Sequence, residues 1–354
     1  MAHRVSKCPC VSVVMAVRDG AGHLARSVES ILNQSYTDLE LIIADCASRD
    51  RTPALLQGFH DRDIRVELVE RDDGDIAGGM AAALDRARGS FVLFMRQDCW
   101  LAPDALEPLA ACARDDALDM AFLGRLEDAI DSKGRVASTT ERRVDAGVWG
   151  RDDGFYRAAA KLYERGLLSD AYGVLIARGI AAAHRDLLAV GEDEGFPFMA
   201  ACVGDAERIG VSGGPGYHDV VVTPGASIPF NPAYAVRCAH EHRLMMDLLR
   251  SGGADADPEA VTAVHRRHVR NLIDCIDNAS VGSSGISASE RLSCVQSMID
   301  DEDVRDSLAA VEAMSGEFGI MYRPMSQRNA AWCCMGSRLR EFVRMSHLPL
   351  GFML

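Results

Sequence analysis

Four acidic residues stand at or just beyond the ends of apolar segments in the first hundred residues, namely Asp19, Asp45, Asp75 and Asp98. Loops need less acid than this for solubility. If the apolar segments are parallel strands of one sheet, the four carboxylates converge, because ligands of an open α/β sheet bind outside the carboxyl ends of its strands. The pattern therefore predicts a binding site for a polar ligand at that edge.

The segment "FVLFMRQDCW" combines two kinds of chemistry in a few residues. Phe91–Met95 is an apolar run typical of a buried strand, and it continues directly into Arg96, Gln97 and Asp98. A carboxylate at a strand end is a ligand that hard cations prefer, and a guanidinium binds phosphate as a planar fork. The alternative is that Arg96 points away from the edge and pairs with a surface acid.

Strand and helix patterns alternate up to about residue 126, which is the order that positions such residues at one edge. β-branched and apolar runs predict strands, and apolar residues at helical spacing predict the helices between them. This order predicts an α/β protein with a mostly parallel sheet and helices on both faces. From residue 231 onward the chain reads as helices, which predicts a C-terminal helical extension. The predicted strands are 11–17, 39–45, 64–70, 91–95 and 118–126.

Composition excludes some classes of function. The 354 residues carry a formal net charge of −14, which argues against general binding of nucleic acid. Eleven cysteines without a secretory signal indicate buried reduced thiols rather than a disulfide framework. No stretch approaches the roughly 20 apolar residues of a membrane span. The tail 340–354 is mildly basic and apolar, and we expect it to pack on the body, with contact to a membrane surface as the alternative.

Three blocks of sequence resemble the family 2 glycosyltransferases of the GT-A fold, especially the bacterial polysaccharide and capsule branch. The block 11–52 resembles the opening strand, helix and second strand. The block 89–107, "GSFVLFMRQDCWLAPDALE", resembles the strand that carries the DxD metal motif. The segments 173–180 and 191–228 resemble the acceptor half, with an acid pair that opens a helix and the later stretch "GYHDV".

The resemblance implies a glycosyltransferase domain at 10–230, with a nucleotide-sugar half at 10–125 and an acceptor half at 126–230, followed by a helical region at 231–354. The implied activity is sugar transfer, with inversion, from a UDP- or GDP-type donor to a glycan or lipid-linked acceptor in polysaccharide biosynthesis. The implied location is the cytoplasm, with the inner face of the membrane as a peripheral site. The oligomeric state is not predicted.

The resemblance also assigns the site residues. Asp98 is the implied ligand of Mg²⁺ or Mn²⁺, which would neutralise the charge of the leaving diphosphate. Arg96 stands where the first acid of the DxD motif is expected. For Asp45 the alternative is a helix or turn cap. The residues implied to surround the donor are Ala16, Val17, Asp19, Asp45, Asp75, Arg96, Gln97 and His218.

Inverting transfer needs a base that takes the proton of the acceptor hydroxyl. In the acid pair of the acceptor half, Asp193 is the preferred base and Glu192 the second candidate. The alternative for this pair is helix capping. For His218, implied to contact the pyrophosphate or metal, the alternative is a structural role.

The sequence argues against two other classes of function. The turn "AVRDGAGHL" lacks the G-x-G-x-x-G of dinucleotide-binding dehydrogenases. It also lacks the glycine-rich, basic phosphate loop of nucleotidyltransferases. The remaining alternative is a catalytically impaired, transferase-like protein that binds a nucleotide or a partner without turnover. The altered DxD motif is the reason to keep it.

Overall fold

The computed structural model describes residues 10–130, 135–142, 144–188, 195–221, 230–280 and 285–346. The chain divides into two compact units, Met1–Val221 and Val222–Leu354. The sequence predicted the boundary at about residue 230. The segment 222–229, which precedes that position, lies outside the described residues. Among the described helices, none combines the length and the apolar composition that a membrane crossing requires.

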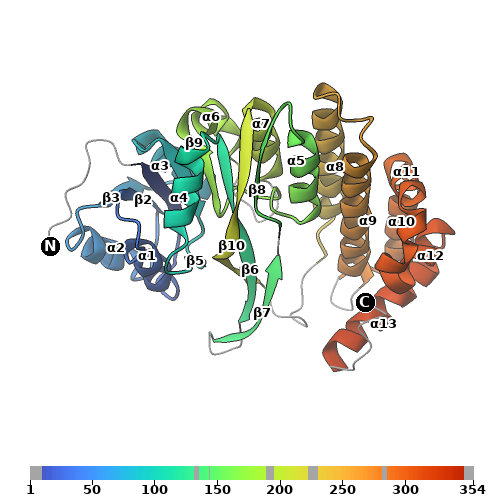
Figure 1. The fold of residues 1–354 in the computed structure, drawn as a ribbon. Helices are drawn as coiled ribbons and strands as arrows, with labels where there is room; N and C mark the ends of the chain where they lie inside the picture. Colours follow the sequence, from blue (N-terminus) through green and yellow to red (C-terminus); the bar gives the residue numbers. More distant parts are fainter. Residues whose placement is uncertain are drawn as a thin grey trace. The chain divides into compact units, whose positions relative to one another are not determined.

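The first unit is built on one mixed sheet, shown in Figure 1. The strand order is β3-β2-β1-β4-β9-β6-β10-β5, with β7 paired to β6 and β8 paired to β10. Strands β1 to β4 pair in parallel, whereas β9 lies antiparallel between β4 and β6. The strands are β1 (Val11–Val17), β2 (Leu39–Cys46), β3 (Val66–Arg71), β4 (Phe91–Met95), β5 (Trp100–Leu101), β6 (Met120–Ile130), β7 (Val136–Arg142), β8 (Gly147–Gly150), β9 (Val174–Ala177) and β10 (Arg208–Val221).

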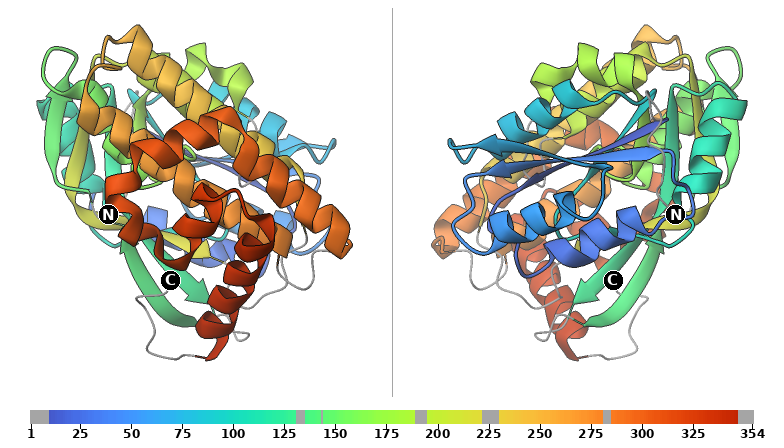
Figure 2. Two further views of the ribbon diagram at one scale, coloured as in Figure 1. Left: turned by 90° about the vertical axis from the view of Figure 1, so that its right-hand side faces the viewer. Right: turned by 90° about the vertical axis from the view of Figure 1, so that its left-hand side faces the viewer.

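Helices cover both faces of this sheet, as the alternation of strand and helix patterns predicted (Figure 2). Alternate residues of β1, including Val13 and Met15, join one buried cluster with residues of α1, α2 and α4. On the other face, α3 lies so close that a Cβ at Gly79 would be 2.3 Å from the Cys46 Sγ. The helices are α1 (Leu24–Leu32), α2 (Thr52–His60), α3 (Ile76–Arg86), α4 (Leu106–Asp115), α5 (Phe155–Glu164), α6 (Arg178–Ala183), η1 (Arg185–Leu187) and α7 (Phe196–Asp205).

The sheet order creates a crevice beside β1. From β1 the chain builds outward to β2 and β3, and it then returns to place β4 on the opposite side of β1. The register aligns Met15 with Met95, so the carboxyl ends of β1 and β4 lie side by side. Connections that leave neighbouring strands in opposite directions open a space between them, and this is where open α/β sheets bind ligands.

The second unit is helical, as predicted. Apolar residues of α9 pack with those of the later helices in one buried cluster that includes Ile276, Ile299, Leu308 and Met325. Helix α10 begins with a capping box, in which Ser287 and Glu290 each bond the backbone N–H of the other. The elements are α8 (Ala233–Ser251), α9 (Pro258–Ser280), α10 (Ala288–Asp300), α11 (Glu302–Ala310), η2 (Glu312–Met321), α12 (Tyr322–Ser326) and α13 (Ala330–Ser346).

Three buried histidines gather around one serine in the second unit. The Nδ1 atoms of His265 and His268 each lie 2.9 Å from the Oγ of Ser307. Ser307 donates its single hydroxyl proton to the Asp303 carbonyl, at 2.8 Å, so both histidines donate from Nδ1. His242 stacks on His268 with ring centroids 3.9 Å apart. We call His242, His265, His268 and Ser307 the histidine cluster.

Candidate active site

A cavity of about 390 Å³ opens at the carboxyl ends of β1 and β4. Five of the residues that the sequence assigned to donor or metal binding line it together, which supports the expectation that strand-end residues converge. The lining also includes residues that sequence reasoning missed. The wall is formed by Ala16, Arg18, Asp19, Ile76, Met80, Met95, Arg96, Gln97, Asp98 and Tyr172.

Gln97 fixes the backbone that follows β1. Its side-chain oxygen accepts from the Arg18 N–H at 3.0 Å, and its amide nitrogen donates to the Arg18 carbonyl at 3.2 Å. Gly20 passes so close that a Cβ there would lie 2.6 Å from the Gln97 Oε1, and its N–H donates to the Thr52 Oγ1 at 2.8 Å. The two strand ends are therefore held together by side chain to backbone bonds.

The loop after β2 holds the same backbone from the other side. Asp19, in a left-handed conformation with φ of 50°, donates its N–H to Ser48 Oγ at 3.0 Å and accepts from the Arg49 N–H at 2.7 Å. Asp50 accepts from the Ala21 N–H at 3.1 Å. Hydrogen bonds from Thr52 above all, and from Ala21, lower the pKa of Asp50. This part of the cavity wall is pre-organised before any ligand binds.

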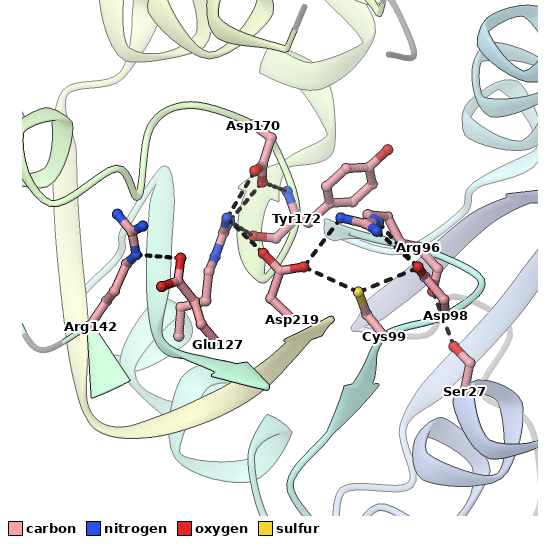
Figure 3. Close-up of polar contacts among 10 residues, drawn as sticks. Ser27, Arg96, Asp98, Cys99, Glu127, Arg142, Asp170, Tyr172 and Asp219 are labelled. Atoms are coloured by element: carbon pink, nitrogen blue, oxygen red, sulfur yellow. Dashed lines mark hydrogen bonds and ion pairs between the residues drawn. The ribbon is translucent and has the colours of Figure 1, made fainter. Parts of the chain in front are cut away.

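Arg96 and Asp98 form a forked ion pair on the cavity wall (Figure 3). The Arg96 Nε lies 3.1 Å from Asp98 Oδ1 and its Nη2 lies 2.8 Å from Asp98 Oδ2. The Nη1 atom donates to Asp219 Oδ1 at 3.2 Å. Arg96 thus pairs with the aspartate two residues away and with a buried aspartate on β10. The alternative, a pair with a surface acid away from this edge, does not describe these contacts.

The pairing continues inward as an alternating series. Asp219 also accepts from Arg125 Nη1 at 3.3 Å, and Arg125 Nη2 donates to Asp170 Oδ1 at 2.6 Å. We call Asp98, Arg96, Asp219, Arg125 and Asp170 the ion-pair chain. Its three carboxylates and two guanidiniums sum to a formal charge of −1. The series runs from the segment after β4 through β10 and β6 to the segment before β9.

Burial and neighbouring charges shift the pKa values of the ion-pair chain in opposite directions. Burial by itself would lower the pKa of Arg96, but the neighbouring acidic groups outweigh it and raise the pKa. Burial raises the pKa of Asp219, while Arg125 and Arg96 oppose the rise. Burial likewise raises the pKa of the Cys99 thiol, so it stays protonated at neutral pH. The Cys99 Sγ lies 3.4 Å from Asp219 Oδ1 and 3.6 Å from Asp98 Oδ1.

The residues present do not fit the predicted metal ion. Both Asp98 oxygens accept from Arg96, and a fixed cation stands where a second acidic ligand was expected. In the parts of the chain that the structure describes, no group of three or more His, Cys, Asp or Glu is arranged to hold a metal ion. A divalent cation at Asp98 would lie directly beside the Arg96 guanidinium, whose like charge opposes its binding.

Four predicted donor residues lie off the cavity wall, namely Val17, Asp45, Asp75 and His218. Asp45 lies near the end of β2, and its Oδ1 accepts from the Ser48 N–H at 3.2 Å. This contact is the one that the turn-capping alternative describes. Asp75 stands at the start of α3, and Val17 is fully buried. Their roles toward a nucleotide stay predictions, as do those of Glu192 and Asp193, which lie outside the described residues.

His218 is engaged on the opposite side of β10 from Asp219. Its Nδ1 lies 2.6 Å from Asp128 Oδ2, and its ring stacks on Trp100 with centroids 4.9 Å apart. The Arg26 guanidinium lies 3.1 Å from the centroid of the same indole. The structural alternative for His218 accounts for these contacts, and its predicted contact with a pyrophosphate stays untested.

Sequence reasoning missed Arg18 and Tyr172 on the cavity wall and the inner half of the ion-pair chain. A signal existed for Asp219: residues 217 and 219 share one face of a strand, opposite to His218, because side chains alternate. Tyr172 had no such signal, because its position depends on the antiparallel insertion of β9 beside β4.

Comparisons with known proteins agree with this architecture. Residues 12–178 match the sequence profile described as Glycosyl transferase family 2. EpsH of Bacillus subtilis, named as a glycosyltransferase, is 24% identical over 200 residues, which cover 54% of this chain and 56% of EpsH. The hyaluronan synthase of Pasteurella multocida is 31% identical over 103 residues, 29% of this chain and 11% of the synthase. The chain thus spans about half the length of the first relative and much less of the second.

Among solved structures, S. aureus TarS 1–349 in complex with UDP superposes with a TM-score of 0.60 at 13% sequence identity. The match covers 96% of this chain and 92% of that one. At this identity the likeness concerns the fold, and it confirms the predicted class: a mostly parallel GT-A sheet flanked by helices, with helices after it.

Proposed function

We propose, from the premise that residues 12–178 belong to glycosyl transferase family 2, that the protein transfers a sugar from a UDP- or GDP-type donor to a hydroxyl group of a glycan or lipid-linked acceptor. Inversion at the anomeric carbon and a place in polysaccharide biosynthesis are part of the proposal. TarS was solved with UDP and with UDP-GlcNAc, which supports a donor of this class.

The cavity between β1 and β4 is the observation that carries this proposal. Its volume of about 390 Å³ falls within the range of roughly 300 to 1,000 Å³ that small-molecule sites occupy. It lies at the point where the strand order reverses, and its wall combines apolar Ile76 and Met80 with charged Arg18 and Arg96. An apolar wall suits the base, and the guanidiniums suit the diphosphate.

In the proposed reaction, the acceptor oxygen attacks the anomeric carbon and forms the new glycosidic bond. The bond from that carbon to the β-phosphate oxygen breaks, and its electron pair leaves with the nucleoside diphosphate. The proton of the acceptor hydroxyl goes to a base, for which Asp193 is the predicted residue and Glu192 the second candidate. Charge accumulates on the leaving diphosphate, so groups that stabilise it accelerate the step.

Binding and turnover test this proposal separately. The full chain is screened by thermal shift with UDP- and GDP-sugars, and each stabilising donor is then incubated with glycan acceptors to measure release of UDP or GDP. We expect stabilisation by one donor class and release that depends on the acceptor. If no nucleotide sugar binds, the proposal is wrong. Binding without release under any acceptor would favour the transferase-like binding protein instead.

A further inference from the structure

We propose that Arg96 takes the place of a divalent cation, so that the donor diphosphate binds to its guanidinium and the protein needs no metal ion. This inference rests on the proposed function, because it concerns the same cavity and the same donor. Its starting observation is the disagreement between the predicted metal site and the forked pair of Arg96 with Asp98.

The replacement preserves the formal charge that the diphosphate meets. An aspartate at position 96 together with a divalent cation would contribute +1, which is the sum of −1 and +2. The arginine contributes the same +1 by itself, and Asp98 contributes −1 in both cases. A guanidinium keeps this charge at every pH the protein meets, since it does not lose its proton in proteins. It also offers two parallel N–H donors, which match the oxygens of a phosphate.

The position of Arg96 suits this role. Its side chain is 22% exposed and forms part of the cavity wall, and it is held from two directions by Asp98 and Asp219. Asp219 is in turn held by Arg125, and that arginine by Asp170. A guanidinium fixed in this way loses little freedom when a ligand binds, which is the condition for effective electrostatic stabilisation of a leaving group.

A diphosphate would compete for Arg96 mainly with Asp98. The Asp98 side chain is 27% exposed, so water solvates it when the phosphate oxygens take over part of the fork. Asp219 is buried and keeps its contact from the inner side. Arg18 lines the same cavity and donates to the Gly74 carbonyl at 3.0 Å, so a second guanidinium is within the site. When the anomeric bond breaks, the electron pair arrives on an oxygen that Arg96 stabilises.

The test measures binding of UDP and of GDP to the full chain by calorimetry, once in excess EDTA and once in excess Mn²⁺. We expect the better ligand to bind equally well in both, within about threefold. Arg96→Gln should weaken binding in EDTA by about 10- to 100-fold, the loss expected for charge-assisted hydrogen bonds. Arg96→Lys keeps the charge without the fork and should lose less.

Arg96→Asp provides the decisive contrast, because it restores two acids at positions 96 and 98. We expect this variant to bind poorly in EDTA and to recover in Mn²⁺. Arg185→Gln is the matched control: Arg185 forms a surface pair with Asp85, away from the cavity wall, and its loss should change neither measurement. Circular dichroism establishes that each variant is folded. The comparison of wild-type binding in EDTA and in Mn²⁺ does not depend on any variant.

Each outcome separates this inference from the proposed function. Wild-type binding that requires Mn²⁺ would overturn the inference and leave the transferase proposal intact. Binding in EDTA that Arg96→Gln and Arg96→Lys leave unchanged would also overturn it. If neither UDP nor GDP binds under either condition, the proposed donor class is wrong, and the inference falls with it.

Discussion

The two units of this protein bury polar groups in opposite ways. In the first unit, the ion-pair chain keeps its charges and sets each against a neighbour of opposite sign. In the second unit, the histidine cluster stays neutral, and two of its three imidazoles, those of His265 and His268, bond a shared hydroxyl. A buried charge is tolerated only with a partner, and a buried neutral imidazole only while it stays neutral.

This difference has functional meaning. Fixed charges at the edge of a cavity can act on a charged ligand, because arginine and ionised aspartate keep their charge over a wide pH range. Neutral histidines cannot act in this way, but they make the stability of their unit depend on pH. Burial, the largest influence, lowers the pKa of His242 to about 2 and that of His268 to about 4. The ion-pair chain suits ligand binding, and the histidine cluster suits packing.

The largest expected effect comes from breaking the ion-pair chain at its most buried cation. Arg125→Met should lower the free energy of unfolding of the first unit by about 3 to 5 kcal/mol, because it leaves Asp170 and the inner oxygen of Asp219 without a cation. Urea unfolding measures the loss. Arg185→Met, at a surface pair, is the control and should cost less than about 1 kcal/mol. A similar loss of stability in both variants would show that the buried pairs of Arg125 matter no more than a surface pair.

The next largest effect on the free energy of unfolding is expected from low pH, which acts on the histidine cluster. The folded state keeps these histidines neutral, whereas the unfolded chain takes up their protons as the pH falls below about 6.5. The stability they contribute is therefore complete above that pH and lost below it. The expected slope is about 1.4 kcal/mol per pH unit for each histidine, between about pH 6.5 and pH 4 for His268. Asp301 limits the effect at His268, and Asp303 and Asp306 limit it at His265.

Urea titrations followed by Trp332 fluorescence, with Trp100 and Trp149 replaced by phenylalanine, measure this slope in the second unit. His268→Gln should reduce it by about 1.4 kcal/mol per pH unit between about pH 6.5 and pH 4. The matched control is His240→Gln, an exposed histidine on the same helix as His242, which should leave it unchanged. An equal slope in all three proteins would show that the cluster does not set the pH dependence.

A smaller effect is expected at the shared hydroxyl. Ser307→Ala removes the acceptor of two buried imidazole N–H groups, and the free energy of unfolding should fall by about 2 kcal/mol. Ser307→Thr keeps the hydroxyl and serves as the control for hydrogen bonding. Equal stability of the alanine variant and the wild type would mean that the histidines find other partners.

Asp219→Asn should have the smallest effect on stability, below about 1.5 kcal/mol. The amide keeps the shape and one accepting oxygen, and it relieves a buried carboxylate whose pKa burial has raised. A double-mutant cycle with Arg125→Met measures the coupling between the two residues. A loss as large as that of Arg125→Met would mean that Asp219, rather than Asp170, is the main partner of Arg125.

Much of the fold followed from local sequence patterns. The strands 11–17 and 91–95 were predicted with the observed bounds, because β-branched and apolar runs indicate a buried strand from the local sequence alone. The segment 208–221 forms one strand between β6 and β5. Edge and interior strands share the same alternation, so only pairing with distant partners distinguishes them.

By itself, the sequence determined which chemical groups stand at the strand ends and that a parallel sheet would bring them together. Residue types also made Arg96 the departure from the expected metal motif. Only the tertiary structure decided what Arg96 contacts, because Asp219 lies 123 residues further along the chain and reaches it through the pairing of β10 with β5 and β6. Charge is a property of the residue, whereas the partner that balances it depends on which strands become neighbours.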